Sequence, residues 1–74
     1  MEELRKVLES VNEYVDYEGE VKLLTDGIID SVELVEMVAA IEEKFEIEIL
    51  LDEITPENFD SLYNIWNMIE RLRR

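Results

Sequence analysis

Three segments of the chain carry apolar residues at the three- and four-residue spacing of an α-helix. They run from residue 2 to about residue 15, from Asp30 or Ser31 to Phe45, and from Asp60 or Ser61 to Leu72. The apolar stripes are Leu4, Val7, Leu8, Val11 and Val15; Leu34, Met37, Val38, Ile41 and Phe45; and Leu62, Ile65, Trp66, Ile69 and Leu72. A chain of 74 residues can form only one thin core, so the three stripes must face one another. The sequence therefore predicts a single all-α domain over residues 1–74.

The segments between these helices add two irregular connections and a short helix. We expect a long loop from Asp16 to Asp30, because the periodicity of this segment is weak and it contains both glycines. The loop should dock its apolar residues onto the bundle: Val21, Leu23, Leu24, Ile28 and Ile29. FEIEI (45–49) alternates like a strand but has no second strand to pair with, so we expect an extended connector that inserts Ile47 and Ile49. Thr55-Pro56 predicts a short helix, which completes a small four-helix bundle with three main helices.

Charge and composition exclude several classes of function. The chain has 20 acidic and seven basic residues, and its net charge of -13 should repel nucleic acids and attract proteins with basic patches, although the same charge also fits simple solubility. No apolar run approaches the ~20 residues of a membrane span, and the N-terminus does not resemble a secretory signal, so we expect a cytoplasmic protein. Without His or Cys, the chain lacks Ser-His and Cys-His catalytic pairs and the usual zinc ligands. We therefore expect no enzyme activity.

A serine at the start of the second predicted helix is the strongest candidate for chemistry. Asp30 is a favourable N-cap, and Glu33, three residues further on, completes a capping-box pattern. Ser31 would then lie in the first helical turn, with its hydroxyl in solvent. The free backbone N–H groups and positive end of the helix would stabilise a phosphodiester at this position by roughly 0.3–1 kcal/mol. Taken alone, Asp30-Ser31 also fits an ordinary helix start.

In its wider context this serine resembles the attachment site of acyl carrier proteins. That family has Asp-Ser followed by an aliphatic residue at the start of its second helix, and this chain has Asp30-Ser31-Val32. EEKFEIEI (42–49) and ITPENFDSL (54–62) also resemble carrier sequences, so the resemblance covers essentially the whole chain. It implies a covalent 4'-phosphopantetheine arm on Ser31, donated by coenzyme A, that holds acyl or aminoacyl intermediates as thioesters. The modifying transferase would supply any general base.

The resemblance also implies a docking face on the second helix. Its outward residues, beside Ser31, are Val32, Glu33, Val35, Glu36 and Ala39. Glu33 and Glu36 would pair with basic residues of a phosphopantetheinyl transferase and of acyl- or aminoacyl-loading ligases or synthases. Val32, Val35 and Ala39 would form an apolar contact with the same enzymes. A plain solvated face is the alternative, and the two outward valines argue against it. We expect the domain to act as a monomer.

The chain departs from the carrier pattern in several places. Val32 differs from the leucine that is common in this part of the motif, and Leu50-Leu51 replaces a proline found in many members. The stretch from Ile49 to Phe59 is also longer than in carriers of fatty acid synthesis. Together with DGIIDS (26–31), these features favour stand-alone carriers of specialised or aminoacyl pathways, such as D-alanyl carrier proteins.

Two other functions remain open. One is an unmodified acidic helical module of the same fold that docks basic partners. The other is a weak metal-binding domain, although the acidic residues at 16–20 lack the spacing of a calcium loop.

Overall fold

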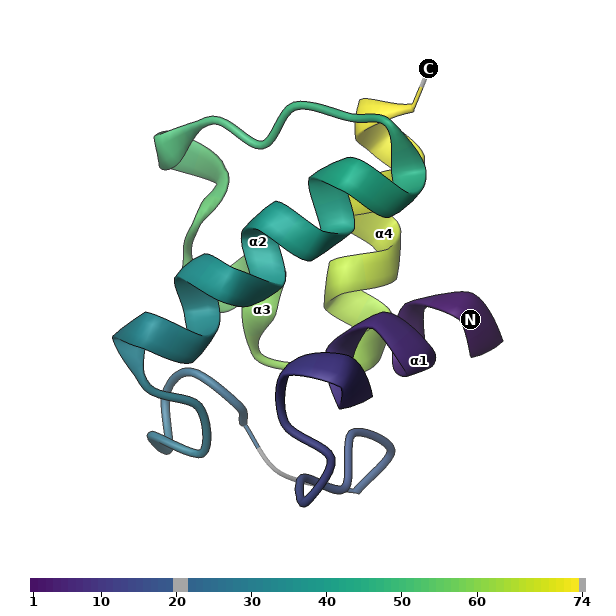
Figure 1. The fold of residues 1–74 in the computed structure, drawn as a ribbon. Helices are drawn as coiled ribbons and strands as arrows, with labels where there is room; N and C mark the ends of the chain where they lie inside the picture. The colour runs from purple at the N-terminus through teal and green to yellow at the C-terminus, as the bar shows by residue number, and fades with distance from the viewer. Residues whose placement is uncertain (20–21, 74) are drawn as a thin grey trace.

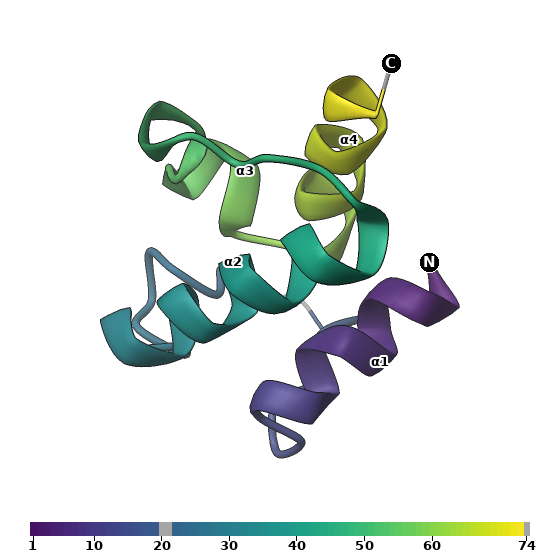
Figure 2. The same ribbon diagram turned by 45° about the horizontal axis from the view of Figure 1, so that its top comes forward.

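Four α-helices follow one another in the part of the chain that the computed structural model describes, residues 1–19 and 22–73. They are α1 (Glu2–Val11), α2 (Ser31–Phe45), α3 (Pro56–Phe59) and α4 (Leu62–Leu72), and a single helical turn, η1 (Leu51–Glu53), precedes α3. In Figures 1 and 2, α2 runs through the molecule between α1 on one side and α3 and α4 on the other. The predicted all-α class, with three longer helices, one short helix and a long loop before α2, is confirmed.

The core lies where the predicted stripes meet. Each main helix contributes side chains that solvent does not reach, such as Leu8, Ile41 and Ile65. Phe59 of α3 is fully buried as well. At one edge the rings of Phe45 and Trp66 meet edge-on with centroids 5.9 Å apart. The buried hydrophobic residues are Leu4, Leu8, Tyr17, Leu23, Ile29, Met37, Val38, Ile41, Ile49, Phe59, Leu62, Ile65, Met68 and Ile69. None of the helices within residues 1–19 and 22–73 is long and apolar enough to cross a membrane.

Helix α1 ends at Val11, four residues earlier than the apolar pattern predicts. Asn12 is extended, and its side-chain oxygen accepts a hydrogen bond from the backbone N–H of Tyr14 (3.0 Å), a local bond that competes with the helix. The hydroxyl of Tyr17 lies 2.7 Å from the carbonyl oxygen of Asn12 and closes the helix end. Val15 still packs against the core from the loop, so the helical spacing persists beyond the helix.

Tyr17 is itself buried although it belongs to the loop. Besides Asn12, its hydroxyl approaches the carbonyl oxygen of Leu8 at 3.1 Å. Burial, assisted by the negative charges of Glu33 and Glu9, raises the pKa of Tyr17 to about 12. The neutral hydroxyl is therefore part of the folded structure at physiological pH.

The loop before α2 docks onto the bundle largely as predicted. Leu23 and Ile29 are buried, and Leu24 packs against the core. Ile28 is 39% exposed, so the prediction that it docks is wrong: its neighbour Ile29 occupies the core position. Val21 lies outside the described residues.

The FEIEI connector is extended, as expected, and no strand forms in the described ranges. Helix α2 ends at Phe45, and the C-cap residue Glu46 adopts a left-handed conformation with φ 55°. Ile49 is buried, Ile47 packs against the core, and the N–H of Ile49 donates to the Glu42 carboxylate at 2.8 Å. The side chain of Glu42 therefore supplies a hydrogen-bond acceptor that a partner strand would otherwise provide.

Candidate attachment and docking site

Ser31 is the first residue of α2, and reciprocal hydrogen bonds fix the backbone around it. The side chain of Asp30 accepts from the N–H of Glu33 (2.8 Å), and the N–H of Asp30 donates to the Glu33 carboxylate (3.1 Å). This is the predicted capping box. The Ser31 side chain is exposed, and its hydroxyl makes no hydrogen bond to any of the described residues. A partner enzyme can therefore reach this hydroxyl on a backbone that is already ordered.

Glu33 is held more firmly than the docking-face prediction assumed. One carboxylate oxygen takes part in the capping box, and the other accepts from the side-chain amide of Asn12 at 2.6 Å. The residue is half-buried, and Asn12 is where α1 ends. Glu33 thus links the end of α1 to the start of α2. A basic partner residue would have to compete with these two bonds, and docking through Glu33 stays a prediction.

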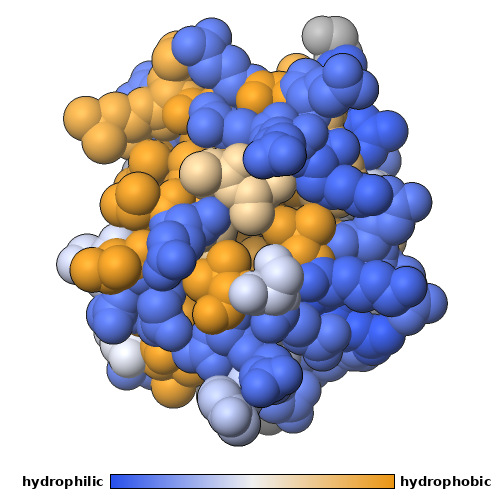
Figure 3. All heavy atoms as spheres, viewed as in Figure 1, coloured by the Kyte–Doolittle hydropathy of each residue, from blue (hydrophilic) through white to orange (hydrophobic). Residues whose placement is uncertain are grey.

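The other four predicted docking residues, Val32, Val35, Glu36 and Ala39, are exposed. Val32 is 67% and Val35 68% exposed, whereas Met37 and Ile41, on the opposite side of the helix, are fully buried. Figure 3 shows hydrophobic side chains breaking through the polar surface over α2. The structure thus brings an apolar strip and one acidic side chain onto the helix that starts with Ser31.

A second exposed apolar pair lies just before and within η1. Leu50 is 57% and Leu51 85% exposed, and hydrophobic atoms cover this part of the surface in Figure 3. In the sequence these leucines stand out only as a departure from the carrier pattern. The available signal was two adjacent apolar residues that belong to none of the apolar stripes.

An ion pair holds η1 against α4. The Glu53 carboxylate pairs with both terminal nitrogens of Arg71 (2.7 and 2.9 Å), and Asn58 donates to the carbonyl oxygen of Glu53 at 2.7 Å. The hydrogen bond from Arg71 is the main reason why the pKa of Glu53 lies below its ordinary value. The turn that carries Leu51 is therefore tied to α4 and keeps this leucine at the surface.

Acidic side chains are abundant, yet no three of them gather into a group that could hold a metal ion in residues 1–19 and 22–73. No family model and no curated protein sequence matches the chain. A functional proposal therefore depends on the geometry around Ser31 and on the sequence motifs themselves.

Proposed function

We propose that the protein is a covalent carrier. Ser31 holds a 4'-phosphopantetheine arm, and acyl or aminoacyl intermediates are carried on that arm between the enzymes of a biosynthetic pathway. The observation that carries the proposal is the exposed hydroxyl of Ser31 on the first residue of a capped helix, within the Asp30-Ser31-Val32 motif. The carrier resemblance of the surrounding segments supports the same assignment.

The start of α2 fits the attached group chemically. The Ser31 oxygen would attack the phosphorus of coenzyme A that bears the arm, so that a new P–O bond forms while the pyrophosphate bond breaks. Adenosine 3',5'-bisphosphate is the leaving group, and a base of the transferase takes the hydroxyl proton. The phosphodiester would lie at the positive end of a 15-residue helix, which favours its negative charge by roughly 0.3–1 kcal/mol. When bound, the arm supplies a terminal thiol for thioester formation. The side chain of Asp30 keeps the helix start in place, since its carboxylate is bound to the N–H of Glu33.

Docking of the transferase and of the loading ligases or synthases is proposed to use the exposed side of α2. Val32, Val35 and Ala39 would form the apolar contact, and Glu36 would face a basic patch. The net charge of -13 would steer such partners mainly by raising the rate of association. In this proposal the carrier acts as a monomer in the cytoplasm.

The test is loading in vitro. Purified protein is incubated with coenzyme A and a broad-specificity phosphopantetheinyl transferase, and the intact mass is measured. We expect one arm on the wild-type protein and none on Ser31→Ala. Ser10→Ala is the matched control, because Ser10 is also exposed on a helix but its hydroxyl bonds to the carbonyl oxygen of Val7.

The alternative, an unmodified module that docks basic partners, would use the same side of α2 but would not need the hydroxyl of Ser31. A wild-type protein that is never loaded, or a Ser31→Ala variant that is loaded as well as wild type, contradicts the carrier proposal.

A further inference from the structure

One residue at the junction of α3 and α4 holds the segment that precedes Ser31. The carbonyl oxygen of Asp60 accepts from the N–H of Leu23 at 2.9 Å. Its carboxylate accepts from the N–H of Leu24 (3.0 Å), from the N–H of Thr25 (2.8 Å) and from the Thr25 hydroxyl (2.6 Å). Three consecutive residues of the loop are thus bound to a single residue far along the chain.

A turn connects the residues that are bound to Asp60 with the start of α2. The carbonyl oxygen of Leu23 accepts from the N–H of Ile29 at 3.1 Å, so residues 23–29 form a closed turn. Within it, Gly27 adopts φ 69°, a left-handed conformation that glycine takes without strain. Leu23 and Ile29 are both buried at the base of the turn. The next residue is Asp30, the N-cap, and Ser31 follows.

The tip of the turn is exposed, and besides the bonds to Asp60 it has only local ones among the described residues, such as those that the N–H groups of Asp26 and Gly27 donate to the carbonyl oxygens of Lys22 (2.8 Å) and Leu24 (3.2 Å). Residues 25–28 are exposed, and Leu24 is only half-buried. Segments with few buried apolar contacts open locally at low free energy, so the bonds to Asp60, which tie this turn to the junction of α3 and α4, should contribute strongly to its order. Half-burial raises the pKa of Asp60, but the hydrogen bonds from Thr25 and Leu24 outweigh it and hold the pKa below its ordinary value. The anchor is therefore ionised at neutral pH.

We propose that Asp60 is a positioning residue for the modification of Ser31. Its carboxylate orders the turn 23–29 and thereby fixes the surface that a transferase meets directly beside the serine. This inference rests on the proposed function, since it assigns Asp60 a part in loading Ser31. Asp60 itself is bound to the loop, and it acts on the serine only through the turn.

Three variants remove different numbers of these bonds, and kcat/KM for the loading of Ser31 measures the effect of each. Asp60→Ala removes the three bonds made by the carboxylate and leaves the one made by the carbonyl oxygen. We expect kcat/KM for loading to fall by about tenfold or more, chiefly through KM, because a hydrogen bond to a charged group is commonly worth at least that factor. Asp60→Asn keeps an acceptor oxygen and should restore most of the loss. Thr25→Val removes only the hydroxyl bond and should show a smaller loss.

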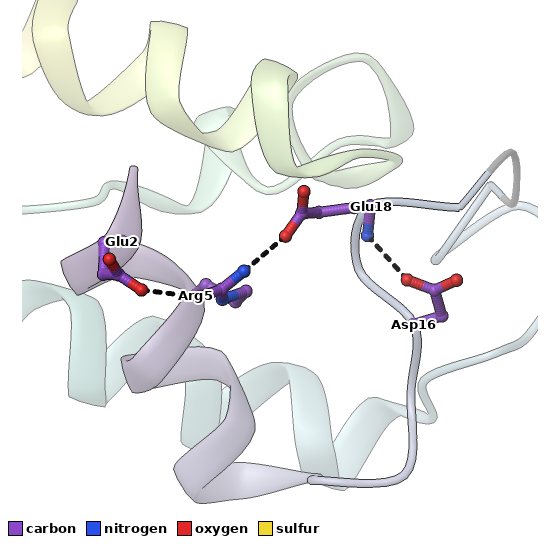
Figure 4. Close-up of polar contacts among 4 residues, drawn as sticks. All are labelled: Glu2, Arg5, Asp16 and Glu18. Carbon is purple, nitrogen blue, oxygen red and sulfur yellow. Dashed lines mark hydrogen bonds and ion pairs between the residues drawn. The ribbon is translucent and has the colours of Figure 1, made fainter.

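Asp16→Ala is the matched control. It removes a carboxylate from the same connection, but among the residues that the structure describes the Asp16 carboxylate accepts only from the nearby N–H of Glu18 at 3.2 Å (Figure 4). Glu18 in turn pairs with Arg5 of α1, away from the turn 23–29. We expect loading of Asp16→Ala to match wild type. An equal loss in both Asp variants would show that bulk charge alone matters, and would overturn the inference.

Amide hydrogen exchange separates positioning from general stabilisation. In Asp60→Ala the amides of Leu24, Thr25 and Ile29 should exchange faster, while those in the middle of α1 and α4 should keep their protection. Faster exchange throughout the domain would overturn the positioning role, and so would wild-type loading by both Asp60→Ala and Thr25→Val. If wild type itself is not loaded, the proposed function fails and this inference fails with it. If wild type is loaded and Asp60→Ala and Thr25→Val are loaded equally well, only this inference is overturned and the proposed function stands.

Discussion

The connections before and after α2, residues 12–30 and 46–55, are held in different ways in the part of the chain that the structure describes. Both insert aliphatic side chains into the core, Ile29 in the first and Ile49 in the second. In the first, the turn before Ser31 has local backbone bonds of its own, and among the described residues its hydrogen bonds to the rest of the bundle all go to Asp60. In the second, the hydrogen bonds are spread over Glu42, Asn58 and the Glu53–Arg71 pair. The difference indicates that order at the candidate site is concentrated in a few bonds and can be changed without dismantling the bundle.

Core truncation should produce the largest effects and should distinguish the two connections. Ile29→Ala and Ile49→Ala should each lower the free energy of unfolding by about 2–5 kcal/mol, measured by urea denaturation. Only Ile29→Ala should reduce loading of Ser31 by more than its unfolded fraction accounts for, because Ile29 ends the turn before the serine. Equal residual loading in the two variants would remove the distinction between the connections.

The Tyr17 hydroxyl tests how the first connection is joined to α1. Tyr17→Phe keeps the buried ring but loses the bonds to the carbonyl oxygens of Asn12 and Leu8, so unfolding should cost about 1 kcal/mol less. Denaturant titration measures this loss. In wild type the contribution should persist up to about pH 10 and disappear as the pH rises through about 12, since burial raises the pKa of Tyr17 in the folded state. A stability equal to that of wild type at pH 7 would contradict this role of the hydroxyl.

Acid should weaken the first connection through Asp60. Its pKa is lower in the folded protein than the ordinary value of 3.8, so its contribution to stability is present above that pH and is lost as the pH falls through the lowered value. Asp60→Asn, which cannot titrate, should show a shallower loss of stability between about pH 5 and pH 2. Equilibrium unfolding across this range measures the slope. Glu48→Gln, at an exposed carboxyl of the second connection, is the control, and an equal flattening there would contradict the special role of Asp60.

The exposed side of α2 begins where the first connection ends, and it should govern partner docking rather than stability. Glu36→Lys should slow loading severalfold and flatten its salt dependence, because steering between exposed charges is screened over about 8 Å at physiological ionic strength. The free energy of unfolding should change little. Glu33→Lys is a poorer probe, since it would also break the capping box and the bond to Asn12.

Glu70→Lys is the matched control for Glu36→Lys. Glu70 is exposed on α4, whose C-terminal end lies far from the start of α2 in both ribbon views. If Glu36→Lys and Glu70→Lys slow loading equally, net charge alone explains the effect, and the exposed side of α2 has no special role in docking.

The sequence predicts those features of the fold and of the candidate site that depend on residues close to one another in the chain. The helices follow from apolar spacing, and the Asp30–Glu33 capping box joins residues three positions apart. The end of α1 was missed because Tyr17, a loop residue, closes it from outside the helix. The anchor at Asp60 was also missed, because its bonds to Leu24 and Thr25 span 36 and 35 positions and leave no local pattern.

The central claim is that Ser31 carries the arm, and direct mapping of the modification tests it best. The protein would be isolated from cells that also produce a phosphopantetheinyl transferase, digested, and analysed by tandem mass spectrometry. The account predicts a single 4'-phosphopantetheine on the peptide that contains Ser31. An arm on Ser10 or Ser61 instead, or a protein that stays unmodified although a known carrier in the same cells is loaded, would contradict it.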